Sequence, residues 1–85
     1  MLDNSEEAIY KSELESHKAF QLYDILKDQQ FERFTEMKES NTLISYLNEV
    51  AQPFYTETLE CMSNGMSVAL AEELAWDNLV QRVGL

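Results

Sequence analysis

The first stretch of helical periodicity covers residues 5–29, in which no glycine or proline interrupts the chain. Asp3, Asn4 or Ser5 can cap its start, because a side-chain oxygen at that position accepts from the free N–H groups of a first turn. Two apolar series follow at helical spacing and are offset from each other. The first contains Ile9, Tyr10, Leu14, His17 and Phe20, and the second contains Ala19, Leu22, Tyr23 and Leu26. The offset predicts either a kink near residues 16–18 or different neighbours along one continuous helix.

Charged residues in the same stretch are spaced as surface ion pairs of a single helix. Lys11 with Glu15, and Asp24 with Lys27, lie three or four positions apart and would face each other on one helix surface.

The next segment, residues 31–38, is predicted to form a short helix or to continue the first one. Phe31 and Phe34 lie on one side of it at helical spacing. The polar residues that follow indicate a break, and Ser40 or Asn41 is the expected N-cap of the next helix.

A clear amphipathic pattern begins at Leu43, and a helix from there is expected to end at Gln52. The residue before a proline is driven away from the helical region, so Pro53 is predicted to divide this part of the chain. A separate helix would then begin at Pro53 and end at Asn64-Gly65, because glycine readily adopts the positive φ of a helix C-cap.

The last helix is the best-specified element, with Ser67 as its expected N-cap and no breaker from Val68 to Val83. Its apolar positions cover a wide arc, formed by Val68, Ala71, Leu74, Ala75 and Leu79, and extended by Trp76, Val80 and Val83. Such an arc exceeds what one face of a small core needs. The helix is therefore expected to contact both its own core and something else.

The candidate interface is the set Met66, Trp76, Val80 and Val83. Tryptophan and methionine are enriched in the cores of protein interfaces. The alternative is that Trp76 simply closes a small core.

Together these elements predict an all-α fold, a small bundle of four to five helices ending in a helical hairpin. Two glycines and one proline are too few for the turns of a β-sandwich. The 85 residues are expected to form one domain, 1–85, with a modest core, and small domains of this kind often gain stability by associating.

The charge is strongly acidic, with 16 Asp and Glu against 6 Lys and Arg and a net charge of −10. No basic stripe is available to release counterions from a phosphate backbone, so direct binding of nucleic acid is disfavoured. The acidic surface either keeps the protein soluble or binds a basic protein, as an inhibitor or DNA mimic would.

Catalytic, metal and cofactor sites are not expected. Nucleophilic catalysis needs a base held against the nucleophile, and Cys61 and His17 lie on different predicted helices without such a context. Glu13 and His17 are four residues apart, but carboxylate–histidine metal bundles repeat this unit on a second helix and this chain has one histidine. No glycine-rich phosphate loop, EF-hand loop or zinc spacing occurs.

The compartment is expected to be the cytoplasm. A single cysteine cannot form an intrachain disulfide, which fits a reducing environment. The first residues are acidic and show no signal peptide, and no apolar run reaches about 20 residues, so no membrane span is expected.

The second half of the chain resembles small helical proteins of Bacteroides-type bacteria and their mobile elements. The resemblance rests on Leu43-Ile44-Ser45-Tyr46-Leu47, Gly65-Met66-Ser67 and Ala71-Glu72-Glu73-Leu74-Ala75. Those proteins are similar in ending with a helix, a glycine turn and an Ala/Glu-rich helix. The resemblance implies this hairpin ending but no activity and no site residues, since that family has none assigned.

The function that these patterns favour is non-catalytic protein–protein interaction, including self-association into a homo-oligomer through the C-terminal helix. One apolar helix face would be buried against the partner, while acidic rims steer and discriminate. The alternative is an acidic inhibitor or DNA mimic of a mobile element or phage, which would occupy a basic groove of its partner.

Overall fold

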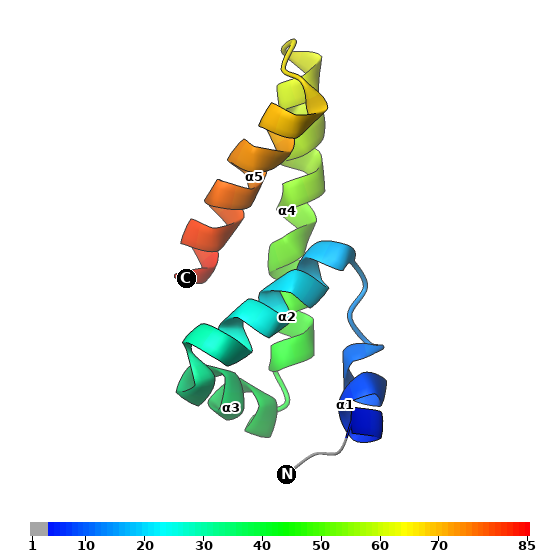
Figure 1. The fold of residues 1–85 in the computed structure, drawn as a ribbon, viewed down its shortest axis with the longest axis vertical. Coiled ribbons are helices and arrows are strands. Elements are labelled where there is room, and N and C mark those ends of the chain that lie inside the picture. The colour runs from blue at the N-terminus through cyan, green and yellow to red at the C-terminus, as the bar shows by residue number, and fades with distance from the viewer. Residues whose placement is uncertain (1–3) are drawn as a thin grey trace. The chain divides into compact units, whose positions relative to one another are not determined.

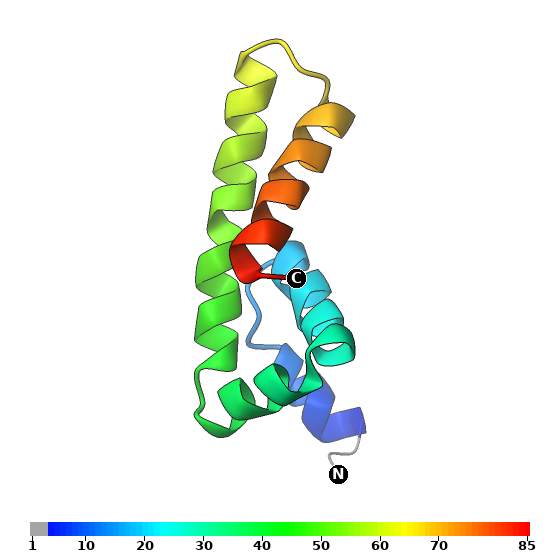
Figure 2. The same ribbon diagram turned by 90° about the vertical axis from the view of Figure 1, so that its left-hand side faces the viewer.

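A computed structural model describes residues 4–85 of the chain, with side chains from Glu6 onward. This part of the chain consists of five α-helices and contains no strand (Figures 1 and 2), which confirms the predicted all-α class and the terminal hairpin. The helices are α1 (Asn4–Lys11), α2 (His17–Gln29), α3 (Phe31–Glu39), α4 (Leu43–Ser63) and α5 (Val68–Val83). The chain forms two compact units, Met1–Asn48 and Glu49–Leu85.

The predicted stretch 5–29 contains two helices, α1 and α2, separated by an irregular connector. The connector begins at Ser12, whose hydroxyl donates to the carbonyl of Ile9, and ends at Ser16, whose hydroxyl accepts from the backbone N–H of Ala19 at 3.2 Å. Serine side chains offer the backbone such alternatives to a continuous helix, so the chain breaks without glycine or proline. The candidate cap Asp3, and the side chains of Asn4 and Ser5, lie outside the described residues.

One side chain from a distant helix holds the connector. The amide of Asn48, in α4, donates from Nδ2 to the carbonyl of Glu13 at 3.1 Å and accepts at Oδ1 from the backbone N–H of Glu15 at 2.7 Å. A carboxamide carries both a donor and an acceptor, so Asn48 satisfies two backbone groups that a continuous helix would have paired internally.

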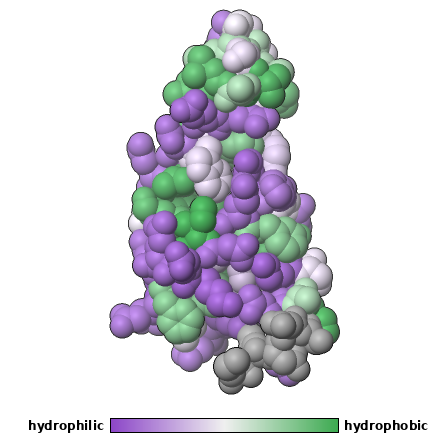
Figure 3. Space-filling view, viewed as in Figure 1, coloured by the Kyte–Doolittle hydropathy of each residue, from purple (hydrophilic) through white to green (hydrophobic). Residues whose placement is uncertain are grey.

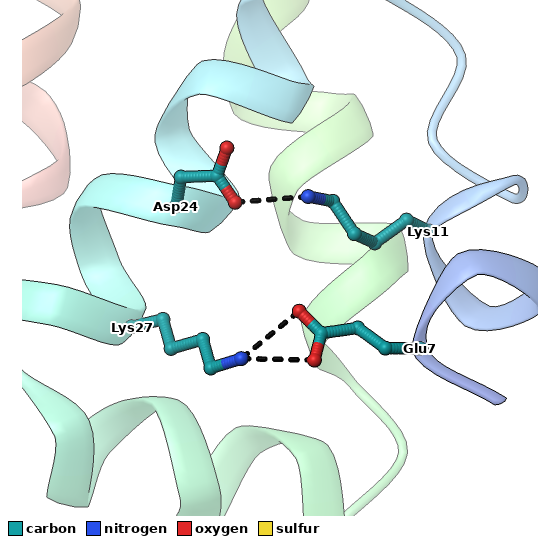
Figure 4. A network of polar contacts seen from close by, with 4 residues as sticks. All are labelled: Glu7, Lys11, Asp24 and Lys27. Carbon is teal, nitrogen blue, oxygen red and sulfur yellow. Dashed lines mark hydrogen bonds and ion pairs between the residues drawn. The ribbon is translucent and has the colours of Figure 1, made fainter. Parts of the chain in front are cut away.

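Two ion pairs join α1 to α2 (Figure 4). Lys11 Nζ lies 2.9 Å from Asp24 Oδ1, and Lys27 Nζ lies 2.9 Å from both carboxylate oxygens of Glu7. The predicted pairings of Lys11 with Glu15 and of Asp24 with Lys27 within one helix are wrong in their partners. Because the helix breaks after Lys11, Glu15 lies in the connector and the lysines reach carboxylates on the neighbouring helix.

An aromatic contact closes the core of the first unit. Tyr23 in α2 is fully buried and meets Phe34 of α3 edge to face, with ring centroids 5.0 Å apart. Phe31 was predicted on the same side as Phe34 and does stack on it, but its side chain is 60% exposed. The apolar side chains buried with them are Leu14, Ala19, Leu22, Leu26, Leu43 and Leu47.

Asn41 terminates α3 and is not the N-cap of α4. Its φ is +61°, and the next residue, Thr42, donates its backbone N–H to the carbonyl of Met37 at 2.9 Å, which is the usual closure of a helix C-terminus. Thr42 is the residue that precedes α4, and its carbonyl accepts the first helical bond from Tyr46. Asparagine tolerates left-handed backbone, which explains its place at the end of a helix.

The predicted end of a helix at Gln52 is wrong, because α4 runs through Pro53 as a single helix of 21 residues. Proline removes one helical hydrogen bond, the one that would reach the carbonyl of Glu49. Glu49 is exposed, so solvent can hydrate that carbonyl, while Ala51 and Phe54 are buried on either side of the proline. Burial on both sides of Pro53 therefore outweighs the lost bond.

The hairpin turn between α4 and α5 lies where the sequence predicted it. Gly65 has a φ of +95° and donates to the carbonyl of Met62, while Met66 donates to the carbonyl of Cys61 at 3.1 Å. Ser67 then caps α5, accepting at its hydroxyl from the N–H of Leu70 at 3.3 Å. Both views show α4 and α5 running antiparallel from this turn (Figures 1 and 2).

Asn48→Ala is expected to lower the free energy of unfolding by about 1–2 kcal/mol, the net value of two hydrogen bonds at the edge of the fold. Urea unfolding followed by circular dichroism measures the loss, and amide hydrogen exchange at Glu15 should accelerate. Asn48→Asp keeps the acceptor toward Glu15 but not the donor toward Glu13. Its free energy of unfolding should therefore lie between those of the parent and of Asn48→Ala. Unchanged exchange at Glu15 in Asn48→Ala would contradict this role.

Gly65→Ala is expected to destabilise the hairpin by about 1 kcal/mol through backbone strain alone. An added Cβ meets no atom within 4 Å, so no steric clash contributes. Gly65→Asn should cost less, because asparagine tolerates positive φ. Urea unfolding followed by Trp76 fluorescence tests the order glycine, asparagine, alanine, and an alanine variant as stable as the parent would refute the assignment.

Candidate functional site

Exposed large apolar side chains concentrate on the α4–α5 hairpin. Of the eight found among the described side chains, six belong to the second unit, which holds fewer than half of the residues. Figure 3 shows apolar colours gathered at the end of the hairpin where α4 meets α5. The six residues are Tyr55, Leu59, Met62, Val68, Leu70 and Leu74.

Three of these residues form a stripe along α4. Tyr55, Leu59 and Met62 follow one another at i, i+4 and i+7, so they lie on one side of the helix. Their side chains are 42%, 64% and 38% exposed. These three residues are called the α4 stripe below.

A polar cluster between the two helices shows which way the stripe faces. Glu57 Oε1 lies 2.7 Å from Arg82 Nη2, and Asn78 Nδ2 makes a longer contact of 3.4 Å with Glu57 Oε2. Asn78 is exposed, while Ala75 and Leu79 beside it on α5 are buried. The cluster therefore lies at one edge of the contact between α4 and α5.

The α4 stripe lies on the hairpin face opposite this polar cluster. Residues two positions apart on a helix point about 160° apart. Tyr55 and Leu59 are each two positions from Glu57, and Trp76 and Val80 are each two positions from Asn78. Trp76 and Val80 therefore share a face with the α4 stripe. This face is called the apolar face, and it consists of Tyr55, Leu59, Met62, Trp76 and Val80.

The four residues of the predicted interface are separated by the structure. Trp76 and Val80 are half-buried and lie on the apolar face, and Met66 is half-buried in the hairpin turn. Val83 is 2% exposed and belongs to the interior of the chain. Of the apolar arc predicted for α5, Ala71, Ala75, Leu79 and Val83 are buried, whereas Val68 and Leu74 are 50% and 38% exposed.

Sequence reasoning missed the α4 stripe. Its i, i+4, i+7 series lies entirely within the helix predicted to begin at Pro53, so the spacing is visible in the sequence. Periodicity alone does not say that Phe54 is buried while Tyr55, Leu59 and Met62 are exposed.

Carboxylates dominate the charge of the same unit. Residues 49–85 contain six acidic residues and a single base, Arg82, which is bound to Glu57. The other five acids, Glu49, Glu60, Glu72, Glu73 and Asp77, are exposed. An open groove of about 420 Å³ runs beside Pro53 and is lined partly by Glu49, Glu57 and Glu60.

A second groove, of about 710 Å³, lies in the first unit, and its charges are balanced. Lys27 is bound to Glu7, and the Lys38 ammonium lies 5.1 Å from the ring centre of Tyr10 and 5.9 Å from that of Phe34. The residues lining the groove are Glu7, Lys27, Phe31, Phe34, Thr35, Lys38 and Glu39. Two lysines and two glutamates give this surface no excess of either sign.

The candidate catalytic and metal-binding side chains are placed as follows. Cys61 is a free thiol, half-buried in α4, and His17 is exposed at the first position of α2. Among the side chains described, no group of three His, Cys, Asp or Glu residues is arranged to hold a metal ion. No helix in residues 4–85 combines the length and apolar character needed to cross a membrane.

Two tyrosine hydroxyls of the first unit are buried without a hydrogen-bond partner, those of Tyr10 and Tyr23. Burial, together with the neighbouring groups Glu7, Tyr10 and Asp24, raises the pKa of Tyr23 to about 12. Burial also raises the pKa of Tyr10, with a further contribution from Glu13. Both groups are held in their neutral form.

Tyr23→Phe is expected to raise the free energy of unfolding by about 1 kcal/mol, because it removes a buried hydroxyl that has no partner. The pKa of Tyr23 is raised when folded, from 10.0 to about 12, so its contribution is complete below pH 10 and is lost as the pH rises toward 12. Urea unfolding on both sides of this range should show a smaller alkaline loss in the variant. Tyr55→Phe, at an exposed site, is the control, and an equal alkaline loss in Tyr23→Phe and the parent would contradict the assignment.

Comparison with known proteins identifies no relative of this chain. No family model matches it, no curated protein matches it, and no solved structure matches it. The similarity to helical proteins of Bacteroides-type bacteria therefore stays a prediction, and function has to be inferred from the chemistry of the described side chains.

Proposed function

We propose that this chain is a non-catalytic protein–protein interaction module that binds its partner through the apolar face of the α4–α5 hairpin. The observation that supports this most directly is the α4 stripe, in which Tyr55, Leu59 and Met62 are all exposed and lie on one side of a single helix. Scattered exposed apolar residues are normal on protein surfaces, whereas a contiguous row is typical of an interaction site.

Apolar burial is the strongest source of binding energy that this surface offers. Full burial of a leucine or methionine side chain is worth about 1.5–3 kcal/mol, so covering the exposed part of Leu59 alone would contribute more than 1 kcal/mol. A surface ion pair contributes about 0–1 kcal/mol. The aromatic side chains of Tyr55 and Trp76 add large, rigid contact areas of the kind found at the centres of interfaces.

Self-association is the form of interaction that the sequence predicted, and the apolar face is compatible with it. A second copy would place the same face against itself across a two-fold axis. Only two of the four residues predicted for this role, Trp76 and Val80, belong to the apolar face. Met66 lies in the turn and Val83 in the interior.

An acidic inhibitor or DNA mimic is the second candidate, and the carboxylates of the second unit favour it. Five exposed acids accompany the hairpin, and its one arginine is already bound to Glu57. A complex held mainly by these charges should weaken steeply as salt is added, while apolar docking should respond little.

The double variant Leu59→Ser with Met62→Ser is expected to keep its fold, lowering the free energy of unfolding by about 1–2 kcal/mol through the partly buried area of the two side chains and serine's weaker helix propensity. Leu79→Ala, at a fully buried position, is the matched comparison and should cost about 2–5 kcal/mol. Urea unfolding followed by Trp76 fluorescence measures both. In light scattering, any rise in mass of the parent with concentration should be lost in the double variant.

The proposal fails if the double variant is destabilised as much as Leu79→Ala. That result would show that Leu59 and Met62 pack inside the single chain in solution, and no apolar row would then be available to a partner.

A further inference from the structure

We infer that the apolar face receives a basic amphipathic helix from a different protein. This inference rests on the proposed function, since it names the kind of partner that the hairpin binds. Three observations support it: the charge around the face, the position of two acids on its edge, and the two methionines, one on the face and one in the adjoining turn.

Charge complementarity favours a basic partner over a second copy. The hairpin unit has six acids against one base, and that base, Arg82, is bound to Glu57 at 2.7 Å. A second copy would bring a further net charge of −10 and no free base from its own hairpin. Lysines and arginines on a partner would instead meet exposed carboxylates that have no base of their own hairpin to pair with.

Acids lie along the edge of the apolar face itself. Glu73, Trp76 and Val80 follow one another at i, i+3 and i+7, so Glu73 belongs to the same side of α5 as the two apolar residues. Asp77 lies four residues after Glu73 and continues this acidic edge. Both carboxylates are exposed. An incoming helix with an apolar stripe and flanking bases would therefore match the face and its edge at once.

The shape of the face also suits a helix. The α4 stripe is three helical positions long and lies beside Trp76 and Val80 of α5, which is the form of surface that accepts an amphipathic helix through anchors at i, i+3, i+4 and i+7. Met62 lies on the face and Met66 in the turn next to it. Methionine is unbranched and flexible, so it adapts to the side chains of the incoming helix.

The test uses a synthetic peptide of about 18 residues, or five helical turns, with leucine at i, i+3, i+4 and i+7 and lysine elsewhere. Its binding to the full chain is followed by Trp76 fluorescence and by calorimetry. A peptide of the same composition with scrambled order, and one with glutamate in place of lysine, are the controls. The aligned lysine peptide should bind more tightly than either, and more weakly as salt is raised from about 0.05 to 0.3 M.

Variants of the protein locate the site. Leu59→Ser with Met62→Ser should weaken the aligned peptide about tenfold or more, as expected for interface anchors. Phe31→Ser, at a 60% exposed aromatic in the first unit, should leave binding unchanged. Glu73→Gln with Asp77→Asn should weaken binding about threefold or more at low salt and little at high salt, while Glu32→Gln, an exposed acid in the first unit, should have no effect.

Each other outcome has a defined meaning. Equal binding of aligned and scrambled lysine peptides would overturn the inference, since attraction would then be purely electrostatic. No binding of any peptide, with self-association that Leu59→Ser and Met62→Ser abolish, would also overturn it and leave the proposed function intact, with a second copy as the partner. No binding and no self-association would overturn both.

Discussion

Two antiparallel helices share one contact, and only side chains that point into that contact can be buried between them. In α5 these are the small or aliphatic residues Ala71, Ala75 and Leu79, which lie on one side of the helix. Apolar residues on the far sides of the two helices cannot be covered by this contact. The α4–α5 hairpin contains more apolar positions than one such contact can cover, and the exposed α4 stripe is the direct result.

The ion pair of Glu57 with Arg82 shows which edge of the contact between α4 and α5 is polar. An exposed ion pair of this kind contributes little to stability, so its main effect is to mark the polar edge of the helix contact. With Glu57 and Asn78 on that edge, helical geometry places Tyr55, Leu59, Trp76 and Val80 on the opposite face. Leu74, four residues before Asn78, is exposed on the polar side, so that edge combines charged and apolar side chains while the opposite face carries the α4 stripe.

Local signals in the sequence predicted the hairpin well and the first half of the chain less well. Ser67 and Gly65 act on their own neighbours, through a side-chain cap and a positive φ, so the turn and α5 could be placed from the residues alone. The connector at residues 12–16 is held by Asn48, more than thirty residues away. A contact between residues so far apart in the sequence cannot be predicted from local periodicity. The predicted helix end at Gln52 was wrong for a similar reason. Burial of Ala51 and Phe54 outweighs the preference of the residue before a proline for non-helical backbone.

The candidate site was predicted in part, and the error has a physical cause. Periodicity gives the direction of a side chain around its helix, which is why Trp76 and Val80 were found, but it does not say which of two apolar sides is covered. Val83 lies close to their direction and is nonetheless buried. Both units carry a net charge of −5, and they differ in how many bases lie among the carboxylates. In the first unit, Lys11 and Lys27 hold carboxylates of a neighbouring helix and Lys38 lies over two aromatic rings, whereas the second unit has one base for six acids. The hairpin combines an exposed apolar stripe with carboxylates that have no base in the same unit to pair with. A partner with both an apolar stripe and positive charge would bury the first and pair with the second.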